Sequence, residues 1–258
     1  MRPAFSLIVA AIVLAPLPLA AQAPRPAAPA QAQPAVPPAK PYKAVAVKLP
    51  APLADATFEA FRKQLGEAAQ KKDRTALAKL VVANGFFWEG EKGDRADKKK
   101  SGIDNLVAAL GLAKKDGDGW DMLGGYSADP TAMPMGEKKD ILCAPADPAF
   151  DEKELEDVAK ATQTDPGDWG YPVGDGIEVR SGPQANTPVS EKLGLHFVRV
   201  MPDSPAPAPN QVPMLKIVTP SGKTGFVTAD AIAPLGNDQL CYVKDAGGWK
   251  ITGFIGGE

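Results

Sequence analysis

Residues 240–255 read LCYVKDAGGWKITGFI, and they predict how the C-terminal end of the chain folds. Leu240 to Val243 and Trp249 to Ile255 are short runs in which aromatic and β-branched residues are frequent, as is typical of strands. Asp245-Ala246-Gly247-Gly248 lies between them and predicts a hairpin turn, because glycine tolerates the positive φ that such turns need. We therefore expect a C-terminal β-hairpin within residues 236–258.

The first strand of this hairpin carries Cys241, and Cys143 is the other cysteine of the chain. Thiols of an exported protein pair in the oxidising compartment that they enter, so we predict a disulfide between the two. In the loop-closure model, a bond between positions 98 apart stabilises the fold by about 4 to 5 kcal/mol. The bond would hold the hairpin against the region that contains Cys143. Two reduced, buried thiols are the alternative.

The N-terminus has the features of an export signal. Arg2 supplies a positive charge, residues 5–21 are uncharged and largely apolar, and Ala21-Gln22-Ala23 fits the small-x-small pattern that signal peptidase cleaves. We predict that residues 1–23 are a signal peptide and that the mature protein is periplasmic or secreted. An uncleaved membrane anchor is the alternative, but the apolar run is shorter than the roughly 20 residues that span a bilayer.

Residues 24–52 have the composition of a linker. Between Pro24 and Pro41 the chain contains 7 Pro and 6 Ala, which provide too little apolar bulk for a core. Residues 24–52 also contain four basic side chains and no acid. We expect a disordered, Pro/Ala-rich linker over these residues.

Residues 53–170 show helical periodicity, from which we predict a mainly helical domain. Apolar residues recur at helical spacing between Thr57 and Gln70, and further helices are expected to begin near Asp73, Ser101 and Asp151, which are suitable N-terminal caps. The aromatic run at residues 86–88 predicts one short strand or a buried anchor.

Residues 171–235 change to a period of two, which is typical of strands. Ile177 and Val179 alternate with Glu178 and Arg180, and glycine and proline separate this run from several later apolar ones. Short strands at such intervals predict a small β-barrel. The expected fold class is therefore α+β, with a mostly helical N-terminal domain, a small barrel and the C-terminal hairpin packed on the helical domain.

Two segments of the predicted barrel resemble a known family. Residues 177–183, IEVRSGP, resemble the "VRSGPS" opening of bacterial SH3-like domains, and residues 221–227, SGKTGFV, resemble their closing "GKTGWV" strand. Ala231-Ile232 follows where that family often has a "YL" pair, and Phe226 stands in place of the usual Trp. The resemblance implies an SH3-like fold over about residues 172–235 and a module that recognises a peptide or a cell-wall component.

Composition excludes some classes of function and leaves others open. The formal net charge is −2, without the basic excess that strong nucleic-acid binding requires. Asp116 to Asp121 alternates acids, but Trp120 and Asp121 occupy positions five and six of the loop, where an EF-hand needs an oxygen ligand and glycine, so we predict a polar turn there. We expect neither a metal nor a cofactor.

Catalytic alternatives rest on few residues. Glu89 and Glu91 next to Trp88 could form the carboxylate pair of a glycoside hydrolase beside an aromatic sugar platform, although neighbours in sequence need not share a cleft. The single histidine, His196, could act as a general base, but a lone histidine in an alternating strand is more often a packing residue. We therefore expect no enzymatic activity.

The leading hypothesis is an exported, non-enzymatic binding or accessory protein of the bacterial cell envelope, whose partner is a peptide, a protein or peptidoglycan, without nucleic acid and without stable membrane insertion after signal cleavage. A structural subunit of an envelope complex without a ligand groove is the second hypothesis. If a groove exists, its candidate residues are Trp169, Tyr171, Arg180, His196 and Phe226, because aromatic side chains often line ligand sites.

Overall fold

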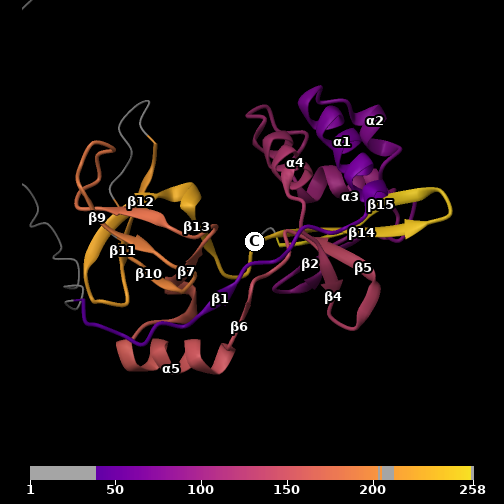
Figure 1. The fold of residues 1–258 in the computed structure, drawn as a ribbon. Coiled ribbons are helices and arrows are strands. Elements are labelled where there is room, and N and C mark those ends of the chain that lie inside the picture. The colour runs from indigo at the N-terminus through magenta and orange to yellow at the C-terminus, as the bar shows by residue number, and fades with distance from the viewer. Residues whose placement is uncertain (1–38, 203, 205–211, 257–258) are drawn as a thin grey trace, which may run out of the picture. The chain divides into compact units, whose positions relative to one another are not determined.

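The computed structural model describes residues 39–202, 204 and 212–256 of the chain (Figure 1). The chain divides into two compact units, and Ala39–Glu258 is the unit that contains all of the described residues. The expected signal peptide and most of the expected linker lie outside the described residues.

The C-terminal hairpin forms the centre of a six-stranded sheet, which we call the host sheet. Its strand order is β3-β2-β15-β14-β5-β4. β15 pairs in parallel with β2, and the other neighbours are antiparallel. The strands are β2 (Phe87–Gly90), β3 (Gly93–Asp94), β4 (Met133–Met135), β5 (Lys138–Ala144), β14 (Gln239–Asp245) and β15 (Gly248–Ile255).

The expectation of a mostly helical N-terminal domain over residues 53–170 is therefore wrong. Four of the six strands in the host sheet come from that stretch. The two strands of the hairpin lie in the middle of this sheet instead of packing on a helical domain. The short runs that form β3 and β4 have no strong strand signal, since they contain glycine, aspartate and proline.

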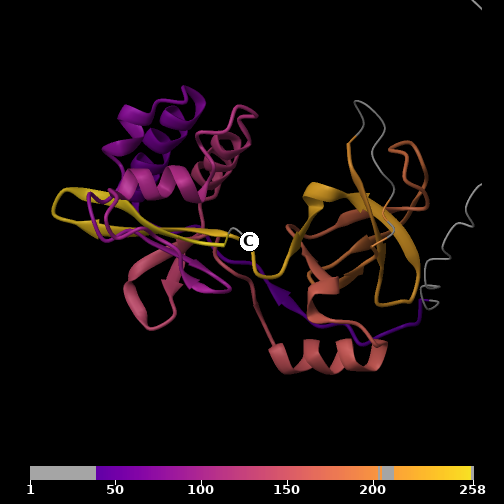
Figure 2. The same ribbon diagram turned by 180° about the vertical axis from the view of Figure 1, so that it is seen from behind.

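Four helices cover one face of the host sheet, as Figures 1 and 2 show from opposite sides. They are α1 (Ala56–Gln70), α2 (Arg74–Ala78), α3 (Gly102–Ala109) and α4 (Asp118–Ala128). α2 and α3 begin at the predicted caps, because the side chains of Asp73 and Ser101 accept hydrogen bonds from the first free backbone amides. α1 begins one residue before the predicted Thr57, and Asp55 caps it in the same way.

The helix α4 contradicts the polar turn expected at residues 116–121. Its N-cap is Gly117, which has a φ of 88° and offers no side-chain cap, and the helix contains Gly119, Gly124 and Gly125. These residues remove the usual signals of a helix start and lower helix propensity. Tertiary packing compensates, because Leu123 of α4 is fully buried against the sheet.

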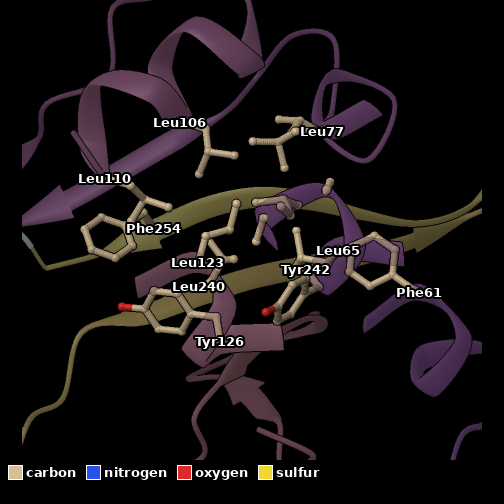
Figure 3. Close-up of a cluster of buried hydrophobic side chains, with 14 of the residues drawn as sticks. Phe61, Leu65, Leu77, Leu106, Leu110, Leu123, Tyr126, Leu240, Tyr242 and Phe254 are labelled. Carbon is tan, nitrogen blue, oxygen red and sulfur yellow. The ribbon is translucent and has the colours of Figure 1, made fainter. Parts of the chain in front are cut away.

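One core lies between these helices and the host sheet (Figure 3). The apolar face of α1 that the sequence predicts contributes Phe58, Phe61 and Leu65, all at most 5% exposed. Leu240 and Tyr242 of β14 meet them from the sheet, and Tyr242 packs edge-on against the rings of Phe58 and Phe61 at 5.2 and 5.6 Å. The hairpin thus forms the sheet side of this core.

The chain leaves the host sheet after β5 and returns to it in β14, and we call the intervening residues 145–238 the insert. The two strands that flank the insert are neighbours in the sheet, with Cys143 directly opposite Cys241. Their sulfur atoms lie 2.00 Å apart, which is the distance of a disulfide. The cysteine pair therefore links the two strands that flank the insert, at the base of the insert. The sequence predicts instead a link between the hairpin and a helical domain.

The insert contains a seven-stranded antiparallel sheet in the order β13-β7-β10-β11-β12-β8-β9. Its core is a separate group of side chains that includes Val179, Val198 and Ile217. The strands are β7 (Trp169–Pro172), β8 (Ile177–Arg180), β9 (Val189–Leu193), β10 (Val198–Val200), β11 (Met214–Val218), β12 (Thr224–Thr228) and β13 (Ile232–Pro234), with 3₁₀ turns at Pro166–Asp168 and Ala229–Ala231.

A third group of buried side chains lies on the outer face of this sheet, under α5 (Glu152–Thr162) and the strand pair β1 (Val47–Lys48) and β6 (Ala149–Phe150). Within the segment expected to be linker, Val45 is 1% exposed and the Tyr42 hydroxyl donates a hydrogen bond to the Val218 carbonyl at 2.9 Å. Tyr42 and Val45 are therefore part of the folded structure, although they lie within the expected linker.

Candidate functional site

A pocket of about 350 Å³ lies beside Tyr171 of β7. Segments far apart in the sequence form its walls: the stretch after β1, the loop after α4, the start of the insert, and the strands β7 and β13 with the loop that leads to β14. Its lining residues are Leu49, Pro50, Asp129, Thr131, Pro145, Ala146, Tyr171, Val173, Ala233 and Asn237. Most are apolar, with four polar side chains, which is the composition typical of ligand sites.

Hydrogen bonds hold the loop after α4 in place at the pocket. The carboxylate of Asp129 accepts from the backbone amide and the hydroxyl of Thr131, at 2.7 and 2.6 Å. The Thr131 hydroxyl in turn accepts from the amide of Ala146 at 2.9 Å. The first residues of the insert are thereby tied to the loop that follows α4.

Gln239, the first residue of β14, also binds the first residues of the insert. It is 8% exposed. Its side-chain amide donates to the Pro145 carbonyl at 2.8 Å and to the Asp147 carboxylate at 3.4 Å. Burial raises the pKa of the Asp147 carboxyl, against the opposing effect of the Gln239 amide. The Asp147 carboxylate is thereby held at the start of the insert, outside the pocket lining.

Tyr171 is the one aromatic side chain among the lining residues of this pocket. It is 6% exposed, and its ring packs edge-on against Phe197 at 6.1 Å. Burial raises the pKa of its phenol, and the negative charges of Asp147 and Asp129 act in the same direction, while a hydrogen bond with Asn237 opposes them. The phenol is therefore neutral at physiological pH and available as a hydrogen-bonding group.

Val173, two residues further on, is 51% exposed although it is a large apolar residue. It lies on the pocket lining together with Tyr171, so a buried ring and an exposed aliphatic side chain share one concave surface. Exposed apolar surface in a hollow is typical of binding sites.

Of the residues that the sequence suggested, Tyr171 lines this pocket and Trp169 does not. Trp169 is 1% exposed, its indole nitrogen donates to the Thr164 hydroxyl at 2.9 Å, and its ring packs edge-on against Tyr42 at 4.9 Å. Its position and partners are those of a core residue.

Arg180 and Phe226 lie together, but outside the pocket. They face each other as partners on β8 and β12, the two strands that carry the resemblance to SH3-like domains. Arg180 is engaged, because its guanidinium donates to the Thr187 carbonyl and to the Glu178 carboxylate, each at 2.9 Å. These residues form a second surface, distinct from the pocket lining.

His196 lies apart from both groups, where its backbone forms an isolated bridge with Ala46. Its Nε2 atom is buried and has no hydrogen-bond partner among the described residues. Burial lowers the pKa of the imidazole, and the nearby Glu191 carboxylate opposes this shift. The five suggested residues therefore do not converge on one groove.

The carboxylates suggested for hydrolysis, Glu89 and Glu91, line a different hollow of about 520 Å³ together with Asp238. Trp88 does not provide an open platform beside them. The guanidinium of Arg95 covers its ring at 4.2 Å, and its indole nitrogen donates to the Gly256 carbonyl at 2.9 Å. One face of the indole is therefore occupied.

Sequence reasoning missed most of the pocket. Asp129, Thr131 and Asn237 lie in loops, where no periodicity marks them, and Val173 follows the last residue of a strand. Only the three-dimensional return of the chain to the host sheet brings them together. An aspartate two residues before a threonine is a local turn signal, but it does not indicate a pocket.

Two features are absent from the described residues. In that part of the chain, no group of three or more His, Cys, Asp or Glu side chains is arranged to hold a metal ion. Likewise, none of the helices in residues 39–202, 204 and 212–256 combines the length and the apolar character needed to cross a membrane.

Comparison of the chain with protein-family models, with curated proteins and with solved structures returns no match.

Proposed function

We propose that the protein is an exported, non-enzymatic binding protein of the cell envelope, and that the pocket around Tyr171 takes a peptide or a peptide-bearing cell-wall component. The observation that carries the proposal is the exposed Val173 beside the buried Tyr171 ring on one concave surface. Apolar contacts there supply affinity, and the side chains of Asp129, Thr131 and Asn237 supply orientation.

The envelope location is supported by the export features of residues 1–23 and by the cysteine pair at disulfide distance. The resemblance of β8 and β12 to strands of bacterial SH3-like domains supports recognition of peptide or cell wall. In this proposal the residues of that resemblance form a separate surface of the insert, and the pocket at the base of the insert binds the ligand.

A purely structural role has less support. An extended apolar patch on the helices would favour such a role. The described residues of α1 to α4 expose one large apolar side chain, Met122. A single exposed apolar residue is ordinary for a protein surface.

Sedimentation of the purified protein with isolated, insoluble peptidoglycan tests the proposal. The variant Val173→Asp places a charge on the pocket lining at a residue that is already 51% exposed, so it leaves the fold intact. Val189→Asp is the matched control, because Val189 is 43% exposed, lies on β9 and does not line the pocket.

We expect retention of the wild type and of Val189→Asp, and loss of about tenfold in the amount of Val173→Asp retained, since a carboxylate would be desolvated against the ligand. Retention of the wild type no greater than that of a tag-only control contradicts the cell-wall form of the proposal. Equal retention of all three proteins places the binding outside this pocket.

A further inference from the structure

The charges at the pocket beside Tyr171 have one sign. Asp129 lines the pocket and the carboxylate of Asp147 acts on Tyr171 from nearby, whereas no lysine or arginine is among the lining residues. Neither carboxylate forms a salt bridge with a described residue: Asp129 accepts from Thr131, and Asp147 accepts from the Gln239 amide. The pocket therefore offers the carboxylate of Asp129, with that of Asp147 nearby, and no cationic side chain on its lining balances their charge.

The tyrosine at the same place suits a cation as well. Tyr171 lines the pocket, and an ammonium group is attracted both to a phenol oxygen and to nearby carboxylates. Neutral apolar contacts continue from the ring along Val173 and Ala233. A ligand that combines an aliphatic chain with a terminal positive charge matches this sequence of surfaces.

From this charge complementarity we propose that the ligand of the pocket carries a primary ammonium group at the end of an aliphatic chain, as in a lysine-like side chain of a peptide. The ammonium lies between the Tyr171 hydroxyl and the Asp129 carboxylate, Asp147 adds to the attraction from outside the lining, and the aliphatic chain packs on Val173. This inference rests on the proposed binding function and names the chemistry of its ligand. A divalent metal ion fits less well, because the described residues form no group of three ligating side chains.

Two small probes test the inference directly on the full mature chain. Nα-acetyl-lysine N-methylamide carries the ammonium group on neutralised ends, and its Nε-acetylated form has the same chain without the charge. Titration of each probe is followed through the backbone amide signals of Val173 and Thr131 in NMR spectra. We expect saturable shifts with the charged probe and at least about tenfold weaker binding of the acetylated one, as loss of a charge-assisted hydrogen bond predicts.

The matched variants separate charge from shape. Asp129→Asn with Asp147→Asn removes both charges, while the side-chain oxygen of an asparagine at position 129 can still accept from Thr131. The control pair, Asp121→Asn with Asp140→Asn, removes the same charge at exposed positions that do not line the pocket. We expect the first pair to weaken binding of the charged probe about tenfold or more and the control pair to leave it unchanged.

Each outcome bears on one proposal or the other. Equal binding of both probes at Val173 overturns the ammonium inference and leaves the pocket as the binding site. Unchanged affinity of the charged probe in Asp129→Asn with Asp147→Asn overturns it too. Absence of any shift with either probe also overturns it, and the proposed function then still depends on the peptidoglycan experiment with Val173→Asp and Val189→Asp.

Discussion

The host sheet and the sheet of the insert are assembled from the chain in opposite ways. All seven strands of the insert's sheet come from the continuous stretch 169–234, whereas Phe87 in the host sheet pairs with Gly253, and Cys143 pairs with Cys241. Non-local pairing carries a larger loop-closure cost before its contacts form. The host sheet is thus complete only when the last strand of the chain is in place, while the insert is a contiguous module.

The comparison also explains where the candidate site lies. The pocket is lined by Asp129 and Thr131, which follow the helices of the host sheet, and by Tyr171, Val173 and Ala233 of the insert. Neither part alone contains the whole lining. An insertion therefore provides a binding surface at its base that neither sheet has by itself, which agrees with the preference of ligand sites for junctions.

The largest effect that we expect concerns the cysteine pair at the base of the insert. The double variant Cys143→Ala and Cys241→Ala opens a loop of 98 positions in the unfolded state, and its free energy of unfolding falls by about 4 to 5 kcal/mol in the loop-closure model. Urea denaturation of the oxidised wild type and of the variant measures this difference.

A single variant, Cys143→Ala, is the control for lost packing, since Cys143 is 1% exposed. It removes the bond as the double variant does, so both should unfold at similar urea concentrations. If the wild type unfolds at the same concentration with and without reductant, the pair does not stabilise the base of the insert.

A somewhat smaller effect tests whether the two cores are separate. Leu123 lies in the core of the host sheet and Ile217 in that of the insert, and both are fully buried. Truncation of either residue to alanine costs about 3 kcal/mol through lost burial and the cavity that remains. Because the two clusters share no residue, we expect each substitution to lower local stability mainly in its own sheet.

Native-state hydrogen exchange measures this distribution. In Leu123→Ala the amides of β14 and β15 should lose protection more than those of β11 and β12, and in Ile217→Ala the order should reverse. Equal loss of protection throughout the chain in both variants would mean that the insert and the host sheet unfold as one cooperative unit.

Local features of the fold are predictable from the sequence, and the pairing of distant segments is not. The apolar face of α1 and the caps at Asp73 and Ser101 follow from apolar spacing and hydrogen-bonding chemistry, and the hairpin β14–β15 follows from its glycine-containing turn. The aromatic run at residues 86–88 predicts a short strand or a buried anchor, and β2 forms there, but nothing local indicates that β2 pairs in parallel with β15 at the other end of the chain. The sequence therefore predicts a mainly helical domain around a strand that in fact belongs to the host sheet.

The same distinction applies to the site. Tyr171 could be suggested because aromatic residues near a predicted boundary are visible in the sequence, whereas Trp169, with the same appearance, is a core residue. Both side chains belong to the buried cluster under β1 and α5, and only Tyr171 also borders the pocket. Asp129 and Asn237 come together at the pocket only because the chain returns to the host sheet.

The measurement that tests the binding site most directly is an amide chemical-shift map of the full mature chain, saturated with soluble fragments that a muramidase releases from peptidoglycan. We expect the signals of Thr131 and Ala146, on the host side, to shift together with those of Val173 and Ala233, on the insert side, with one common affinity. Shifts confined to the neighbourhood of Arg180 and Phe226 on β8 and β12 would contradict the pocket and place recognition on the SH3-like strands.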